Sequence, residues 1–304
     1  MKRIALSVLA GAGVIFLTIA AATMPRLFAQ SADFVLDVTV TDKAGPVTNL
    51  NKEDLQIQDD GKRATITNVT SVVARGSTAP GDGREIVLIL DDAGVPMAGT
   101  PALQQIATIF ASAAGPGDNV SVIRFHNGTD DLTKNREVSL ARIAAFSAGS
   151  VPYVNEETDI DMFKLMAKLA TKLGEVAPNR RKAIICIGSP AVCNPLERDS
   201  TAPRDEYPSW VNVLAATARN NVLVYSAIPA PVNLMGAGVV QRTGGTFFAG
   251  LTNYTPAIER VYGDLSQYYM ATYTVEASNK QIRNLTVRTT RKDTTVKARD
   301  RRGK

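Results

Sequence analysis

From residue 85 onward, the chain alternates between short apolar runs and stretches of helical periodicity. Residues 86–90 (Ile-Val-Leu-Ile-Leu) are continuously apolar, which is typical of a strand covered on both faces. Further strand patterns at residues 120–125, 183–187, 222–225 and 246–248 are separated by segments with helical spacing. This alternation predicts a doubly wound α/β fold with a mainly parallel sheet over residues 84–267.

The segments on either side of this region have a period of two. Residues 34–41 alternate between apolar and polar side chains, and the pattern returns after residue 267. Neither segment is long enough to bury a core alone. We therefore expect residues 31–83 and 268–304 to form one β-sandwich, with the α/β domain inserted between its halves. A Gly- and Pro-containing stretch at residues 74–84 predicts the first boundary.

Residues 1–30 have the pattern of an export signal. Lys2 and Arg3 precede residues 4–25, which carry no charge. Small residues at 20–22 and around 29 favour cleavage of a signal peptide. An uncleaved membrane anchor is the alternative, because about twenty apolar residues suffice to span a bilayer. Either outcome predicts a periplasmic, envelope-associated or secreted location for the rest of the chain.

The net charge and the small numbers of histidines and cysteines exclude several classes of function. The net charge of +5 comes largely from the two ends, since residues 280–304 hold ten basic and two acidic residues. A generally basic surface for nucleic acid is therefore not expected. The basic C-terminus predicts either contact with an anionic membrane or a charged, solvated strand edge. A single histidine and two cysteines exclude a multi-histidine site and a cysteine cluster for zinc.

The two cysteines allow two interpretations. Cys186 lies in an apolar strand pattern, and Cys193 follows in a loop that contains proline and asparagine. In an oxidising compartment the loop could fold back to form a disulfide between them. The alternative is one buried thiol and one unrelated loop thiol.

Several motifs resemble a von Willebrand factor type A domain. They are the strand ending in Asp91, the step GPGDNVSVIRF, the strand RKAIICIGSP and the segment VLVYSA. The flanking segments VTVTDKAGPVTNLNKEDLQIQDDGK and DLSQYYMATYTV more specifically resemble the VWFA-related acidobacterial family. The resemblance covers nearly the whole chain after residue 30. It implies a metal-ion-dependent adhesion site at the carboxyl edge of the sheet, where a partner's carboxylate completes the shell of a divalent cation.

The ligand positions implied by this resemblance are only partly filled. Asp91 matches the first aspartate of the Asp-x-Ser-x-Ser element, and Thr158 matches the later threonine. Ala93 and Val95 stand at the two serine positions, and neither side chain has an oxygen. Ser189 stands where a late aspartate is expected.

Three other carboxylates are close in sequence to the matched positions. Asp92 follows Asp91, while Asp159 and Asp161 follow Thr158. They are candidate substitute ligands, although an ordinary solvated loop is the more common setting for such residues. Mg²⁺ requires a nearly octahedral set of oxygen ligands. We therefore expect a degenerate site that binds Mg²⁺ or Ca²⁺ weakly or not at all, and no other cofactor.

These features predict an exported, non-enzymatic module that binds a protein partner in the envelope or outside the cell. A hydrolase that uses Ser189 and His126 at the same sheet edge is the first alternative. The sequence around Ser189 does not match the Gly-x-Ser-x-Gly turn of serine hydrolases. A purely structural envelope component is the second alternative.

Overall fold

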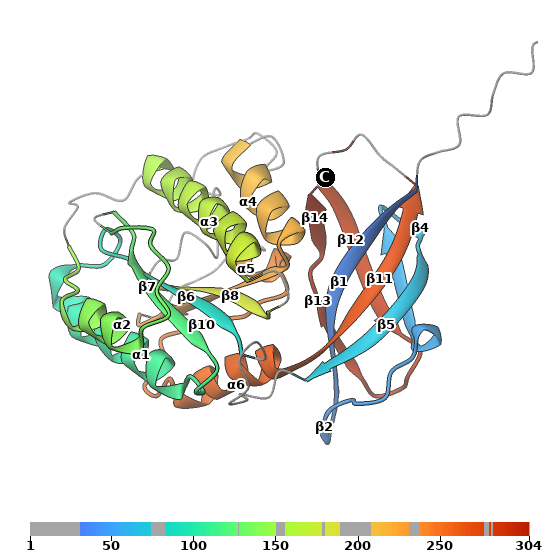
Figure 1. The fold of residues 1–304 in the computed structure, drawn as a ribbon, viewed down its shortest axis with the longest axis horizontal. Coiled ribbons are helices and arrows are strands. Elements are labelled where there is room, and N and C mark those ends of the chain that lie inside the picture. The colour runs from blue at the N-terminus through green and yellow to red at the C-terminus, as the bar shows by residue number, and fades with distance from the viewer. Residues whose placement is uncertain are drawn as a thin grey trace, which may run out of the picture.

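The computed structural model describes residues 31–73, 83–126, 128–149, 156–177, 180–188, 208–230, 238–276, 280 and 282–303. Two units lie side by side: a parallel sheet between layers of helices, and a pair of antiparallel sheets (Figure 1). The predicted export signal and most of the predicted linker lie outside the described residues. None of the helices in the described ranges is long and apolar enough to cross a membrane.

The parallel sheet has five strands in the order β10-β9-β8-β6-β7. They are β6 (Glu85–Leu90), β7 (Asn119–Arg124), β8 (Lys182–Ile187), β9 (Val222–Ile228) and β10 (Phe247–Ala249). Every residue of β6, β8 and β9 is buried, as expected for apolar strands covered on both faces. The predicted α/β fold around a parallel sheet is therefore confirmed.

Helices cover both faces of this sheet (Figure 1). On one face, Leu88 and Leu90 pack against the first helical layer, and on the other, Val87 and Ile89 pack against the second. The first layer is α1 (Thr100–Ala113), α2 (Arg136–Ala144) and α6 (Thr255–Ser266). The second layer is α3 (Glu156–Val176), α4 (Pro208–Arg219) and α5 (Val239–Arg242).

The antiparallel sheets combine strands from both ends of the chain. In the first sheet the order is β13 (Thr295–Ala298), β1 (Ser31–Asp42), β11 (Gln267–Glu276) and β5 (Thr65–Val73), and β2 (Gly45–Pro46) also pairs with β1. In the second, the order is β14 (Arg301–Gly303), β12 (Ile282–Thr289), β3 (Leu55–Asp59) and β4 (Lys62–Arg63). The N-terminal strand β1 therefore lies between two strands from the C-terminal segment.

One apolar cluster is shared by the two antiparallel sheets. Leu36 and Val38 of β1 lie with Tyr269 and Tyr273 of β11, and Ile57 of β3 packs against them from the second sheet. The Tyr269 hydroxyl donates a hydrogen bond to the Val47 carbonyl over 2.8 Å, so its polar end is satisfied inside the core. The period of two seen in the sequence correctly identifies the side chains that face this core.

Candidate functional site

The carboxyl ends of the parallel strands form the candidate site. The chain adds β7 on one side of β6 and β8 on the other, so the order in which strands are added reverses between the parallel neighbours β6 and β8. Open α/β sheets bind ligands at such a reversal. Asp91 and Asp92 follow β6, Gly188 follows β8, and His126 lies just beyond β7.

Asp91 is buried at the end of β6, and its carboxylate is bound by its own turn. Its Oδ1 accepts hydrogen bonds from the backbone N–H groups of Ala93 and Gly94 over 2.9 and 2.8 Å. A Cβ atom at residue 94 would lie 2.5 Å from Asp91 Oδ2, so glycine is required for this approach. Burial raises the pKa of Asp91, although the two N–H groups act in the opposite direction.

Asp92 is also buried, and it joins the loop after β6 to the loop after β7. Its Oδ1 accepts the backbone N–H of His126 over 2.8 Å. Arg124 Nε lies 3.8 Å from Asp92 Oδ2, and His126 Nδ1 lies 3.7 Å from Asp92 Oδ1. The Asp92 carboxylate, a candidate substitute metal ligand, therefore faces the Arg124 guanidinium and the backbone N–H of His126.

The two residues at the serine positions are part of the core. Ala93 and Val95 are buried, and Val95 belongs to the cluster that includes Leu103 of α1. Gly188 has φ +107°, and a Cβ there would lie 2.9 Å from Val95, 3.0 Å from Leu103 and 3.2 Å from Asp91. The loops after β6 and β8 are thus closely packed against each other by apolar contacts.

The remaining predicted ligands lie at the start of α3 or outside the described residues. Thr158 is buried in the first turn of α3. Asp161 forms an exposed ion pair with Lys164 over 2.8 Å. Ser189 and the side chain of Asp159 are outside the described residues. Within the described ranges, no three His, Cys, Asp or Glu side chains lie together as a metal-binding group.

The donor set at this edge does not fit the adhesion-site metal that the resemblance implies. One oxygen of Asp91 already accepts two N–H groups, and Asp92 is engaged with Arg124 and His126. The neighbouring Ala93 and Val95 bring methyl groups where a hard cation needs oxygens. The structure therefore brings Asp91, Asp92 and His126 to one edge, but as parts of the loop architecture.

Only one of the two cysteines lies within the described residues. Cys186 is buried in β8, in the cluster between the sheet and α3. Cys193 lies outside the described residues. The disulfide therefore stays a prediction.

Several basic residues of the C-terminal segment form ion pairs within the molecule. Arg283 Nε lies 2.5 Å from Asp59 Oδ1, and Arg291 lies 2.8 Å from Asp54. Lys280 lies 3.0 Å from Asp60. These acids come from the N-terminal segment, so part of the positive charge noted in the sequence is neutralised across the antiparallel sheets.

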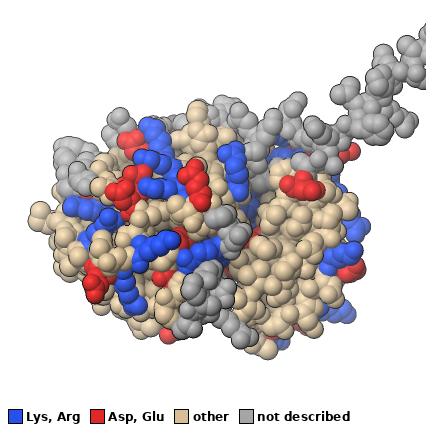
Figure 2. Space-filling view, in the orientation of Figure 1, with Lys and Arg blue, Asp and Glu red and all other residues tan. Residues whose placement is uncertain are grey.

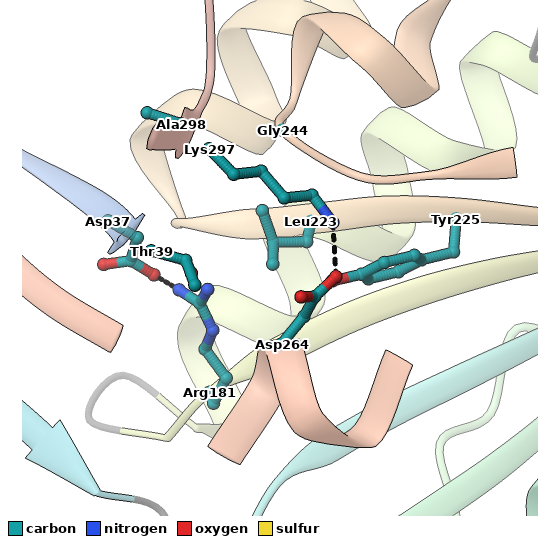
Figure 3. Close-up of a pocket in the computed structure, with 9 residues that line it drawn as sticks. All are labelled: Asp37, Thr39, Arg181, Leu223, Tyr225, Gly244, Asp264, Lys297 and Ala298. Atoms are coloured by element: carbon teal, nitrogen blue, oxygen red, sulfur yellow. Dashed lines mark hydrogen bonds and ion pairs between the residues drawn. The ribbon is translucent and has the colours of Figure 1, made fainter. Parts of the chain in front are cut away.

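A second polar cluster, which sequence reasoning missed, lies where the two units meet (Figure 3). Arg181, just before β8, forms a buried ion pair with Asp37 of β1 and stacks on the Tyr268 ring at 3.8 Å. Lys297 of β13 pairs with Asp264 of α6. Each ion pair joins the two units, so the pairs fix the orientation of the units. No local sequence pattern identifies the partners, because they are distant in the chain.

The pocket beside these ion pairs is too small for a substrate. The buried Tyr225 hydroxyl has no hydrogen-bond partner among the described residues. The lining is completed by Thr39, Leu223, Gly244 and Ala298. The space accommodates roughly one water molecule. This junction is therefore a structural joint, and the sheet edge at Asp91 remains the candidate site.

No model of a known protein family matches this chain, and none of the curated proteins matches it either.

Proposed function

We propose that this protein is an exported, non-enzymatic binding module in which a von Willebrand factor type A-like domain is inserted in a β-sandwich. The motif resemblance supports this proposal, and so does the observed combination of a parallel sheet between two helical layers with antiparallel sheets built from both chain ends. The partner is a protein in the envelope or extracellular space. The pattern of residues 1–30 supports export.

The construction of the loop after β6 carries the proposal. Its two carboxylates are held by internal hydrogen bonds and ion pairs, and Ala93 and Val95 anchor it in the core. The same loop leaves Met97 68% exposed. A flexible methionine side chain on a rigid loop suits contact with an apolar patch on another protein. Recognition at this edge then depends on shape and apolar contact and does not require a bound cation.

Membrane association is a further part of this proposal and is assigned to the N-terminal segment. Lys280, Arg283 and Arg291 are neutralised by internal acids, which weakens the attraction of the C-terminus to anionic lipid. The apolar residues 4–25 offer the membrane contact instead while they remain attached.

Photocrosslinking at the sheet edge tests the proposal. A photoreactive amino acid at Met97 should crosslink a partner in intact envelopes, with the same yield in the presence of a chelator. The matched control is Val176, which is 49% exposed at the end of α3, toward the opposite end of the sheet. Equal crosslinking from both positions, or loss of the Met97 product with chelator, would contradict the proposal.

A hydrolase is the second candidate, because the exposed His126 lies 3.7 Å from the buried Asp92. Such a neighbour can orient a histidine base. If this alternative holds, His126→Ala and Ser189→Ala should each abolish turnover of ester or amide substrates. Unchanged turnover in both variants would assign the observed hydrolysis to a contaminant. A purely structural role predicts no crosslinked partner at Met97 at all.

A further inference from the structure

Strand β5 lies at the edge of the first antiparallel sheet. Its residues Thr65–Val73 pair with β11 along one side. None of the strands that the structure describes pairs with the opposite side of β5. Its outer backbone N–H and C=O groups therefore face outward, and such groups form a template for another strand.

This strand lacks the features that usually prevent pairing between molecules. The sequence TITNVTSVV contains no charged residue and no proline. Six of its nine residues are exposed, and Val73 is 50% exposed. Its only irregularity is a register shift opposite Thr272 and Tyr273, which leaves Thr67 out of the paired register. The edge from Asn68 to Val73 is thus regular and neutral.

The other edge strands of the antiparallel sheets are much shorter than β5. At the far side of the first sheet, β13 has four residues, while β4 and β14 at the edges of the second sheet have two and three. Residues 31–37 of β1 also have no partner strand on the side away from β11 among the described residues, so a closed assembly requires that β5 pairs with its own copy.

The surface next to β5 is also neutral. Figure 2 shows a broad area without Lys, Arg, Asp or Glu over the unit that contains β1, β11 and β5. Val35 of β1 is 52% exposed on this face. Lys62, shortly before β5, is neutralised by Glu276 over 2.7 Å. A partner at this edge is therefore selected by strand pairing and β-branched contacts, with little contribution from charge.

We propose that β5 pairs antiparallel with β5 of a second copy of this chain, forming a twofold symmetric dimer. A second copy presents an edge of identical length and neutral charge, so no like charges meet within the strand. Its Thr and Val side chains suit cross-strand contacts. A twofold interface is closed, which explains how this edge avoids open-ended aggregation. The surface is separate from the sheet edge at Asp91, so this proposal does not depend on the proposed function.

Sedimentation velocity of the full chain over a wide concentration range tests the dimer. The wild type should show a concentration-dependent monomer–dimer equilibrium. Thr70→Lys, at an exposed position of β5, should weaken it by roughly tenfold or more, because two like charges meet across the new pair. Val35→Lys is the matched control, since it adds the same charge to the same sheet face on an inner strand. It should leave the equilibrium unchanged.

A charge exchange separates specific pairing from misfolding and from association through residues 1–30. Thr70→Glu should also be monomeric, and a mixture of Thr70→Glu with Thr70→Lys should form heterodimers. Circular dichroism of each variant should match the wild type. A monomeric wild type, a dimer that persists in Thr70→Lys, or a mixture that stays monomeric would overturn the proposal.

Discussion

Asp118 and Asp91 are buried carboxylates at opposite ends of the parallel sheet, and different kinds of group bind them. At the amino ends of β6 and β7, Asp118 is fully buried and accepts two hydrogen bonds from the Arg84 guanidinium, over 3.0 and 2.6 Å. At the carboxyl end of β6, Asp91 is equally inaccessible but is held by backbone N–H groups, and no arginine of the described residues forms an ion pair with it. Asp118 therefore has a full ion pair, while the charge of Asp91 is only partly compensated by its hydrogen bonds.

The pKa values follow this difference. Burial acts to raise the pKa of both groups, but the hydrogen bonds from Arg84 hold the pKa of Asp118 below its ordinary value. The pKa of Asp91 is raised, because its two backbone donors do not compensate for its burial. In open α/β sheets the carboxyl end is the usual ligand end. The raised pKa of Asp91 therefore belongs to a buried carboxylate at that end.

Replacement of Asp118 should have the largest effect on stability. Asp118→Ala should lower the free energy of unfolding by about 3–5 kcal/mol, because it leaves the Arg84 guanidinium buried without its carboxylate. Urea unfolding measures this change. Asp161→Ala, which removes an exposed ion pair with Lys164, is the control and should cost less than about 1 kcal/mol. Similar losses in the two variants would contradict the structural role of Asp118.

Removal of the carboxylate at the other end should cost less. Asp91→Ala loses the acceptor for the Ala93 and Gly94 N–H groups, and should destabilise the protein by about 1–3 kcal/mol. Asp91→Asn retains an oxygen acceptor and removes the charge, so its free energy of unfolding should stay within about 1 kcal/mol of the wild type. If the charge itself were required, Asn would be as harmful as Ala in the same urea titration.

The pH dependence of stability should have opposite signs at the two ends. The contribution of Asp118 is present above the ordinary value of 3.8 and is lost as the pH falls through its lowered folded pKa. The raised pKa of Asp91 means that its contribution declines as the pH rises from 3.8 through its folded pKa. Relative to wild type, Asp91→Asn should therefore gain stability with rising pH in that window. Urea midpoints measured at successive pH values check the sign, and a relative loss would refute it.

Divalent cations should have the smallest effect. Titration calorimetry with Mg²⁺, Ca²⁺ and Mn²⁺ should show no binding tighter than about millimolar, the weak end of biological calcium sites. The reason is that Asp91 and Asp92 are already engaged and that Ala93 and Val95 supply no oxygen. Micromolar binding that disappears in Asp91→Ala would restore metal-dependent adhesion as the mechanism.

The regular elements were largely predictable, and the exceptions have local causes. The strands at β6, β8 and β9 are continuous apolar runs, so pattern alone finds them. The apolar pattern does not identify helix α2, because only Ser139 and Ile143 among its residues are buried and its apolar spacing is weak. A capping signal was available: the Asn135 side chain accepts the N–H groups of Glu137 and Val138.

The position of the candidate site could be predicted from the sequence, but the hydrogen bonds and ion pairs of its residues could not. Asp91 follows an apolar strand, which already places it at the carboxyl edge of a parallel sheet. The engagement of Asp92 with His126 depends on the lateral order of β6 and β7, which no local pattern encodes. The ion pair between Arg291 and Asp54 could not be predicted either. Charge counts identify the basic C-terminal segment but give no information about the partners of its residues.

By itself, the sequence determined which segments are strands or helices and which of their faces are apolar, since these properties depend on side chains a few residues apart. Only the tertiary structure decided which charges meet. Arg181 and Asp37 come from different units, and their ion pair exists because the chain returns to β1 after completing the parallel sheet. Burial then makes such pairings decisive, because a charge removed from water requires a partner wherever the fold places it.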